Sequence, residues 1–434
     1  MMSEGCRILF NWESPGTSSK GYKVGGTRPP SAFYKRVVMG DLPATRLKAV
    51  SAPLKLARDV RSYQVEAAFL ASDACAQLRS SGVRVPCIYS SELRPTPESP
   101  IDSRFATLAE DFSAEDGWEQ HGTLSSYQAV ASLRALARFH AFFWSGANFW
   151  REGQEGMDKG TKSAAACQLE EAVWPSGCYW QPSMQPASQM AQVAEHFDAH
   201  VTRFGVRFER AAAALGLGRV AMLSLGARLQ EVAIEVAEES HPFGKPISAD
   251  EDMNRACDLE RFRTLVHGDP KAANMFFRTR EHEAGSGPQL DVAIIDFQWS
   301  GFGLAATDVS HHIVAALAPE ALNANDTTGS ALAAMEEAEK HLLDAYHCEL
   351  CEALVANGCA STAEQAALEV FSRATLQAQY ETAVLDMGRL VFAYQWSRAD
   401  FGVPALNRNS YNKDVRSAAW LATRCDALLN KRHA

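Results

Sequence analysis

The sequence predicts an α+β protein, with a small antiparallel sheet in its first part and a larger, mostly helical second part. Short β-like runs separated by turn residues fill residues 1–112, and apolar residues at helical spacing dominate from Ser125 onward. The chain has 434 residues, of which 47% are hydrophobic. This is enough for a substantial core and for about two or three domain-sized units.

The strand-like runs of the first part are rich in β-branched and aromatic residues, and Gly, Pro and Ser separate them. A loop over residues 14–21 joins the first two runs, and a helix over 60–79 ends near Gly82. The simplest arrangement is one small sheet with one helix. The runs cover residues 7–12, 22–24, 32–39, 87–89 and 104–108.

The second part is predicted to be a series of helices around one short buried strand, residues 292–295. Residues 150–190 are rich in Gly, Ser, Pro and Gln and lack periodicity, so we expect an irregular insertion there. The predicted helices cover residues 124–144, 192–213, 221–239, 308–318, 330–357, 362–394 and 411–430.

Composition and charge argue against several classes of function. The net charge is −10 and no long run of Lys or Arg occurs, which argues against nucleic acid as a partner. The first residues lack the apolar stretch of a signal peptide, and no window approaches the ~18 apolar residues of a membrane span. The ten cysteines are therefore expected to be reduced thiols in a cytoplasmic protein. His347, Cys348 and Cys351 lack a second pair at zinc-like spacing, so we interpret them as helix-borne side chains.

Two neighbouring segments carry the strongest chemical signal: LVHGDPKAANMFF from residue 265 and VAIIDFQ from residue 292. Asp269 and Asn274 lie five apart on one tight loop, and Asp296 ends a buried strand. Phosphoryl transfer needs such a set: one carboxylate to orient or deprotonate the attacking hydroxyl, and a second with a carboxamide to hold Mg²⁺ against the triphosphate. Residues 275–278 and 290–295 fit the arms of a hairpin that brings the three side chains together.

Each segment also has an ordinary structural interpretation, since His-Gly-Asp can be a turn and Ile-Ile-Asp a strand end. Both occur in order, at hairpin spacing and with Asn274 in place. This combination favours the chemical interpretation.

The pattern His-Gly-Asp-x-x-x-x-Asn followed by Ile-Asp-Phe-Gln resembles the choline kinase and aminoglycoside phosphotransferase superfamily. Within it, the pattern is closest to the CHK kinase-like (ecdysteroid kinase-like) family. Protein kinases have His-Arg-Asp and Asp-Phe-Gly instead, so Gly268 and Gln298 point to small-molecule kinases. The resemblance covers residues from about 22 to about 315.

This resemblance implies a protein-kinase-like fold with two lobes. An N-lobe of residues 1–112 would contain the sheet and the helix C segment, with an interlobe hinge at 108–112. A mostly helical C-lobe of residues 113–434 would contain the catalytic loop, 265–298. The insertion, about 145–262, and the helices after 315 lie outside the core that the resembling superfamily shares. We therefore expect them to build the acceptor site.

The resemblance also implies ATP and Mg²⁺ as cofactors and assigns roles to the motif residues. Asp269 would accept the proton of the acceptor hydroxyl as the catalytic residue, supported by Asn274 and by His267, which braces the loop. Asn274 and Asp296 would hold the metal ion. Asp308 is expected to anchor the loop.

The N-terminal motifs that support the resemblance are less specific than those near residues 267–298. Lys35 would contact the α- and β-phosphates, and Glu66 would pair with it. A lone lysine on a strand is usually only solvated. Glu66 supports the functional interpretation of Lys35, because a buried cation near phosphate needs a carboxylate to hold it in position.

The hinge would hold adenine through its backbone near Glu110 and Phe112. The phosphate loop over 14–21 would cap the phosphates with its backbone N–H groups and with Ser18 and Ser19. It has two glycines and four hydroxyl residues rather than a Gly-x-Gly-x-x-Gly pattern.

Three further histidines have structural interpretations. His140 is expected to support packing of the C-lobe. His311 and His312 are expected to open a helix, and nothing near them in the sequence argues for a metal site.

The predicted function is an ATP-dependent transfer of the γ-phosphate onto a hydroxyl of a small molecule, either an amino-alcohol or a sterol-like alcohol. The alternative is a catalytically weak, kinase-like protein that binds nucleotide or acts as a scaffold. Late aromatic residues could form a cage for a quaternary amine, but helix packing is the interpretation we favour. They are Tyr380, Phe392, Tyr394, Trp396, Phe401 and Trp420.

Overall fold

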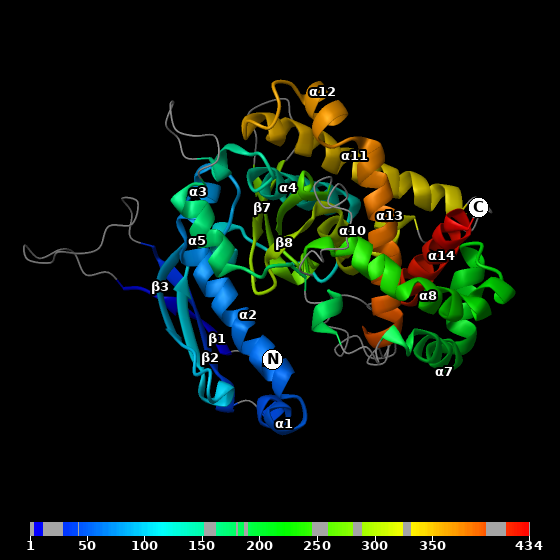
Figure 1. Cartoon of the computed structure of the whole chain (residues 1–434), viewed down its shortest axis with the longest axis horizontal. Coiled ribbons are helices and arrows are strands. Elements are labelled where there is room, and N and C mark those ends of the chain that lie inside the picture. Colours follow the sequence, from blue (N-terminus) through cyan, green and yellow to red (C-terminus); the bar gives the residue numbers. More distant parts are fainter. Residues whose placement is uncertain are drawn as a thin grey trace, which may run out of the picture.

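A computed structural model gives the structure of most of the chain (Figure 1). The described residues are 4–11, 29–41, 43–151, 162–178, 181–185, 190–244, 259–280, 289–323, 331–395 and 414–433. The predicted class is confirmed, since an antiparallel sheet near the N-terminus is followed by a mostly helical part.

The N-terminal sheet has four antiparallel strands in the order β1-β2-β4-β3. Strand β2 is central, and Lys35 pairs with Gly5 on one side and with Thr107 on the other. The predicted runs match these strands to within a few residues, except that residues 22–24 lie outside the described part. The strands are β1 (Glu4–Leu9), β2 (Ser31–Val38), β3 (Ile88–Arg94) and β4 (Arg104–Ala109).

The helix predicted over 60–79 is two helices, α2 (Pro53–Ala71) and α3 (Asp73–Ser80). Ser72 separates them because its side chain accepts a hydrogen bond from the Cys75 N–H, which starts a new helix. A further helix, α1 (Pro43–Ser51), was not predicted.

Helix α2 covers one face of the sheet, with a small apolar core between them (Figure 1). Val37 and Phe105 from the strands meet Leu56, Val60 and Tyr63 from the helix. These helix positions recur at three- and four-residue spacing, so one face of α2 is buried against the sheet.

The second part of the chain contains the remaining helices (Figure 1). Helix α4 packs on α11, α10 packs on α13, and α8 packs on both α7 and α13. The helices are α4 (Ser126–Phe142), α5 (Ala164–Ala172), α7 (Val193–Ala214), α8 (Arg219–Ser240), α10 (Ala305–Ala316), α11 (Ala331–Ala356), α12 (Ala363–Gln365), α13 (Arg373–Leu390) and α14 (Val415–Arg432).

Two helix predictions need correction. Residues 150–190 were expected to be irregular, yet they contain α5, which Ser163 caps by accepting the Ala166 N–H. The helix predicted over 362–394 is interrupted, because a π-helical turn (Ala366–Val370) ends α12 and Ser372 caps α13 anew.

Two short strand pairs lie inside the helical part. The predicted hairpin is confirmed as β6 (Met275–Arg280) paired antiparallel with β7 (Gln289–Ile294). The second pair, β5 (Arg263–Val266) with β8 (Gly301–Leu304), was not predicted.

The hairpin connects the two parts of the chain. The Ile294 N–H donates to the Arg84 carbonyl at 3.0 Å, and Phe277 exchanges backbone hydrogen bonds with Glu119. Beside this contact, Phe112, Trp118 and Ala293 form a separate small apolar cluster. The sheet, the hairpin and the helices are thus joined where the motif residues lie.

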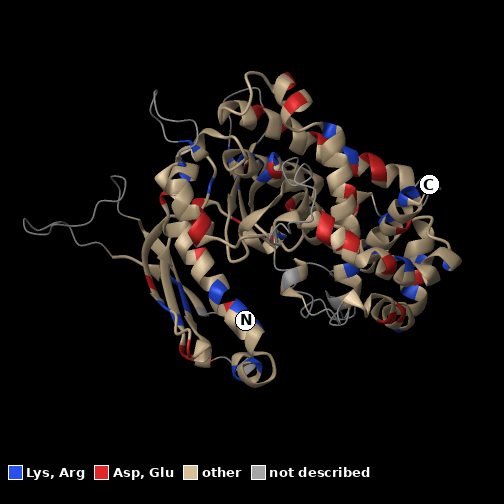
Figure 2. Cartoon of the chain, viewed as in Figure 1, with Lys and Arg blue, Asp and Glu red and all other residues tan. Residues whose placement is uncertain are grey.

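Charged residues of both signs are spread along the helices and strands rather than gathered on one face in this view (Figure 2). Within the described residues no single helix has the length and apolar composition of a membrane span. The helices α7 and α8 reach that length and composition only together, across a bend of 102°.

Candidate functional site

The His-Gly-Asp loop, residues 267–271, leaves the end of β5 and leads through a short 3-10 turn, Ala272–Asn274, into β6. Gly268 has a φ of +82°, and a Cβ there would lie 2.3 Å from the Trp299 carbonyl oxygen. Only glycine fits this close approach in the left-handed region. The residue that marks the variant of the motif is therefore required by the local packing.

Asp308, on α10, holds the start of this loop. Its carboxylate is 1% exposed and accepts the backbone N–H groups of His267 at 2.6 Å and Gly268 at 2.9 Å. His140 Nε2 donates to the same carboxylate at 3.1 Å, and Tyr346 donates to His140 Nδ1 at 2.7 Å. Despite the opposing effect of burial, these hydrogen bonds lower the pKa of Asp308. The expected anchoring contact of Asp308 is present.

Two histidines tie the loop to its neighbours. His267 is fully buried, donates from Nε2 to the Ile295 carbonyl at 2.8 Å and accepts the Asp269 N–H at Nδ1. It therefore joins the loop to the segment that carries Asp296. His312 Nδ1 donates to the Pro270 carbonyl at 2.6 Å, and burial lowers the pKa of His312 to about 4. Its ring is neutral near pH 7.

The Asp269 carboxylate is surrounded by donors. Lys271 Nζ lies 2.5 Å from Oδ2, and Asn274 Nδ2 lies 3.3 Å from the same oxygen. His311 Nε2 lies 3.4 Å from Oδ1. Burial alone would raise the pKa of Asp269, but Lys271 and His311 lower it well below its usual range. Asp269 is thus a carboxylate at any pH near neutrality.

Asp296 follows β7 directly and has a φ of +67°, which is a strained conformation for a residue with a side chain. Its Oδ1 is buried and has no hydrogen-bond partner among the described residues. The Ile295 N–H donates to the Asn274 carbonyl at 3.0 Å, which brings the two predicted metal ligands side by side.

These residues fit a magnesium ion. The side-chain N–H of Asn274 donates a hydrogen bond to the Asp269 backbone carbonyl at 2.8 Å, so the amide oxygen of Asn274 is directed elsewhere. A carboxylate oxygen and an amide oxygen are ligands that Mg²⁺ accepts, and the unpaired Asp296 Oδ1 would gain a partner.

Lys35 and Glu66 come together from β2 and α2, with 2.6 Å between Nζ and Oε2. Gln298 Nε2 donates to the same Glu66 oxygen at 3.4 Å, so the residue after the Asp-Phe pair also contacts this ion pair. Burial would lower the pKa of Lys35, but the carboxylates of Glu66 and Asp296 raise it. Lys35 is therefore a fixed cation facing Asp296.

The predicted hinge residues use their side chains in packing. Glu110 forms an ion pair with Arg84 and accepts the Cys87 N–H at 3.3 Å. Phe112 is buried against Trp118 with ring centroids 5.1 Å apart. The side chains of Glu110 and Phe112 are therefore engaged within the protein. Ser18 and Ser19 lie outside the described residues.

Part of the insertion lies along the chain that follows Asp296. The Trp174 N–H donates to the Ser300 carbonyl at 2.9 Å, and the Cys178 N–H donates to the Trp299 carbonyl at 3.0 Å. Arg61 of α2 donates to the Glu171 carbonyl at 3.1 Å. The insertion thereby fixes both the helix that carries Glu66 and the segment after Asp296.

The remaining candidates lie in packed positions. The late aromatic residues Tyr380, Phe392 and Trp420 are at most 1% exposed, which agrees with helix packing. The Tyr394 side chain, Trp396 and Phe401 lie outside the described part. His347 donates from Nε2 to the Phe371 carbonyl at 2.8 Å, and Cys351 contacts its ring on the same helix, α11.

Sequence reasoning missed two residues that contact Asp269. Lys271 lies inside the quoted motif, two positions after Asp269, and its closeness to the aspartate was the available signal. His311 was expected to open a helix, but α10 begins at Ala305 and carries His311 in its interior. Its three-residue spacing from Asp308 places both side chains toward the loop.

Part of the chain matches a known protein family. Residues 249–357, which include Asp269, Asn274 and Asp296, match the model of the ecdysteroid kinase-like family. Over this segment the chain is similar to the ecdysteroid kinase-like family, as the motifs predicted. None of the curated proteins compared with the chain matches it.

The chain is also similar to a crystal structure at 2.32 Å resolution from Ralstonia eutropha JMP134, of a protein named as an aminoglycoside phosphotransferase. The sequence identity is 14%, and the match covers 92% of this chain and 86% of the other. The TM-score is 0.33.

Proposed function

We propose that the protein is an ATP-dependent phosphotransferase that moves the γ-phosphate onto a hydroxyl of a small molecule. One observation carries the proposal: two lysines from distant parts of the chain converge on two carboxylates. Lys35 from the sheet and Lys271 from the loop both lie in the field of Asp296, and Lys271 also contacts Asp269. Cations beside metal-binding oxygens suit a polyphosphate.

Asp269 is the group that accepts the proton of the acceptor hydroxyl. Lys271 and His311 occupy both of its oxygens, so an incoming hydroxyl must replace one of them. Lys271 would be the partner that leaves Oδ2, because its long side chain could turn toward the γ-phosphate. This exchange frees Asp269 for the hydroxyl and places a cation on the phosphoryl group as it transfers.

Asn274 and Asp296 would hold Mg²⁺, which neutralises charge on the phosphates when it is bound. Lys35, held by Glu66, orients the α- and β-phosphates. The backbone of residues 108–112 holds adenine. In this arrangement, residues 1–112 and 113–434 act as two lobes around the nucleotide, and positioning and charge neutralisation supply most of the acceleration.

The test is a comparison of Asp269→Asn with Asp291→Asn, assayed for ADP release and for Mg-ATP binding by calorimetry. Asp291 pairs with Arg278 on the outer hairpin, so its variant controls for loss of a carboxylate near the site. We expect Asp269→Asn to lose turnover by at least about a hundredfold while it binds Mg-ATP as the wild type does. Full activity of Asp269→Asn would remove the assigned role.

A further inference from the structure

Helix α8 carries a row of exposed apolar side chains on the face that it turns away from the core. Its buried side chains pack on α7, α13 and α14 (Figure 1). On the opposite face Val220 is 85% exposed, Leu223 53% and Ile234 60%, and Ala227 between them is also exposed. Single exposed apolar residues are ordinary, but a row along the solvent face of one helix indicates an interaction surface.

The row has the spacing of a helix–helix contact. Together with Glu231, the exposed positions follow one another in steps of three and four residues, as in the seam between two paired helices. At about 1.5 Å of rise per residue, the row spans about 21 Å from Val220 to Ile234. Its middle position is Ala227, whose small side chain lets a second helix come close.

The row is also two-fold symmetric about Ala227. Val220 and Ile234 lie seven residues to either side of it, and Leu223 and Glu231 lie four residues to either side. If a second α8 lies antiparallel with the two Ala227 residues facing each other, Val220 of one copy faces Ile234 of the other. Leu223 then faces the aliphatic stem of Glu231. Every position in the row is exposed, so two copies can present the same residues to each other, as a two-fold interface requires.

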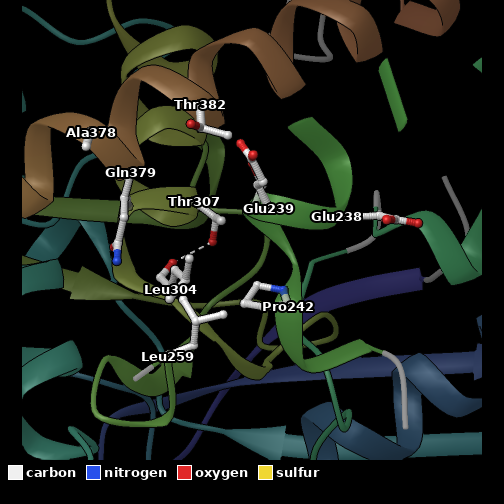
Figure 3. Close-up of a pocket in the computed structure, with 11 residues that line it drawn as sticks. Glu238, Glu239, Pro242, Leu259, Leu304, Thr307, Ala378, Gln379 and Thr382 are labelled. Atoms are coloured by element: carbon white, nitrogen blue, oxygen red, sulfur yellow. Dashed lines mark hydrogen bonds between the residues drawn. The ribbon is translucent and has the colours of Figure 1, made fainter. Parts of the chain in front are cut away.

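The charges at the ends of α8 oppose the dipole of their own helix. The N-terminus of a helix carries partial positive charge, yet α8 begins with Arg219 and has no acidic residue in its first turn. Glu238 and Glu239 lie in the last turn, which has no basic residue. Figure 3 shows this end of α8, where Glu239 is turned toward Thr382 and Glu238 points away from the other labelled side chains. This charge order suits an antiparallel neighbour.

An antiparallel copy brings opposite charges together beside both ends of the row. Arg219 and Glu235 each lie eight residues from Ala227, so Arg219 of either copy faces Glu235 of the other. Arg219 is exposed and has no ion pair among the described residues. Glu235 has 58% of its side chain exposed, although it also contacts Arg432. In a parallel pair the two Arg219 side chains would meet instead, which is unfavourable.

We propose that α8 is a self-association surface, on which two copies of this chain form an antiparallel, two-fold dimer centred on Ala227. The inference goes beyond the proposed function and does not depend on it, because no residue assigned to phosphate transfer lies on α8. A lipid surface fits the row less well, since Glu231 and Glu235 lie where a membrane-binding helix carries Lys or Arg. A single helix pair is small for a specific interface, so we expect a Kd in the micromolar range.

Sedimentation velocity of the full chain from about 1 to 100 µM tests for the dimer, because this range covers the Kd of a small interface. Leu223→Glu places a carboxylate opposite Glu231 of the second copy, twice in each dimer, and we expect dimerisation at least about a hundredfold weaker. The control is Leu368→Glu, the same change at a leucine on the π-helical turn that is 74% exposed. It should dimerise as the wild type does, and circular dichroism checks that both variants fold.

Two further variants test the antiparallel direction. Arg219→Glu should weaken dimerisation about tenfold, because the ion pair occurs twice, and Glu235→Arg in the same chain should restore it. A chain with both Val220→Cys and Ile234→Cys should form a cross-linked dimer on oxidation, above the background of the wild type. Val220→Cys alone should not, because the two copies of residue 220 lie about 21 Å apart along the pair.

A wild type that stays monomeric up to the highest concentration would overturn the inference, and so would a dimer that Leu223→Glu leaves intact. Cross-linking through Val220→Cys alone would contradict the antiparallel direction. Flotation with vesicles of phosphatidylcholine and phosphatidylserine tests the other occupant. Vesicle binding by a monomer, lost in Leu223→Glu, would assign the row to a lipid surface and refute the dimer. ADP release should be equal in wild type and Leu223→Glu, so the proposed function is tested separately.

Discussion

Replacement of Asp308 by alanine tests how the His-Gly-Asp loop is held in place. The carboxylate accepts two buried backbone N–H groups, from His267 and Gly268, and the ring N–H of His140. Each buried N–H left without an acceptor costs about 1–3 kcal/mol, so the two backbone groups together cost about 2–6 kcal/mol. This is a large share of the stability of a typical domain.

Urea unfolding measures this loss as a lower midpoint at an unchanged slope. The control is Asp344→Ala, because Asp344 has 51% of its side chain exposed and pairs only at the surface with Arg373. We expect its cost to stay below about 1 kcal/mol. If Asp308→Ala came within about 0.5 kcal/mol of the wild type, the loop would be held by other contacts and the reasoning would be wrong.

The pH dependence of stability gives a second test of the contacts that Asp308 makes. Because the pKa of Asp308 is lowered in the folded protein, its carboxylate stabilises the fold above the unfolded value, about 3.9, and this contribution is lost as the pH falls through the folded value. Asp308→Asn should therefore lie below the wild type in stability near pH 7. The gap should narrow below about pH 4.

Three further outcomes follow from the site. Gly268→Ala should lower the unfolding temperature more than Gly216→Ala does. Both glycines have a positive φ, but of the two only Gly268 would place its new Cβ against a carbonyl oxygen, at 2.3 Å. Equal losses of thermal stability in the two variants would contradict this close approach. Lys271→Met should raise the pKa of Asp269 and move the acid limb of the kcat/KM profile to higher pH, and an unmoved limb would contradict their contact. The pKa of His312 is lowered to about 4 in the folded protein, so between about pH 6.5 and 4 only the unfolded chain binds the proton, and stability falls as the pH falls. His312→Gln should therefore lose less stability than the wild type between pH 7 and 5 in urea titrations. An equal loss in both proteins would contradict the lowered pKa of His312.

The sequence was sufficient for the parts of the site that local spacing determines. Asp269 and Asn274 lie on one tight loop, and the β6–β7 hairpin, which the spacing of the two motif segments predicts, brings Asp296 to them. The pairing of Lys35 with Glu66 was predicted only through the resemblance, because no local pattern connects a strand with a helix 31 residues later.

Other features depend on tertiary contacts that the sequence does not display. His311 meets Asp269 only because α10 is packed against the loop, and a histidine within an apolar helix looks like a core residue. Strand β8 contains Gly301 and Gly303, which argue against a strand, yet Gly301 is needed because the backbone of Trp174 lies against it. The breaks at Ser72 and Ser372 depend on single side-chain caps inside long helical patterns.

The most direct test of the central claim is the thermal stability of wild type and Asp296→Asn with and without 1 mM Mg-ATP. A ligand with a Kd near 0.1 mM stabilises the folded protein by about 1.4 kcal/mol at that concentration, which raises the unfolding temperature of the wild type by a few degrees. We expect this rise to need both Mg²⁺ and Asp296, and the variant to show almost none. No rise in the wild type, or an equal rise in the variant, would contradict a nucleotide site at Asp296.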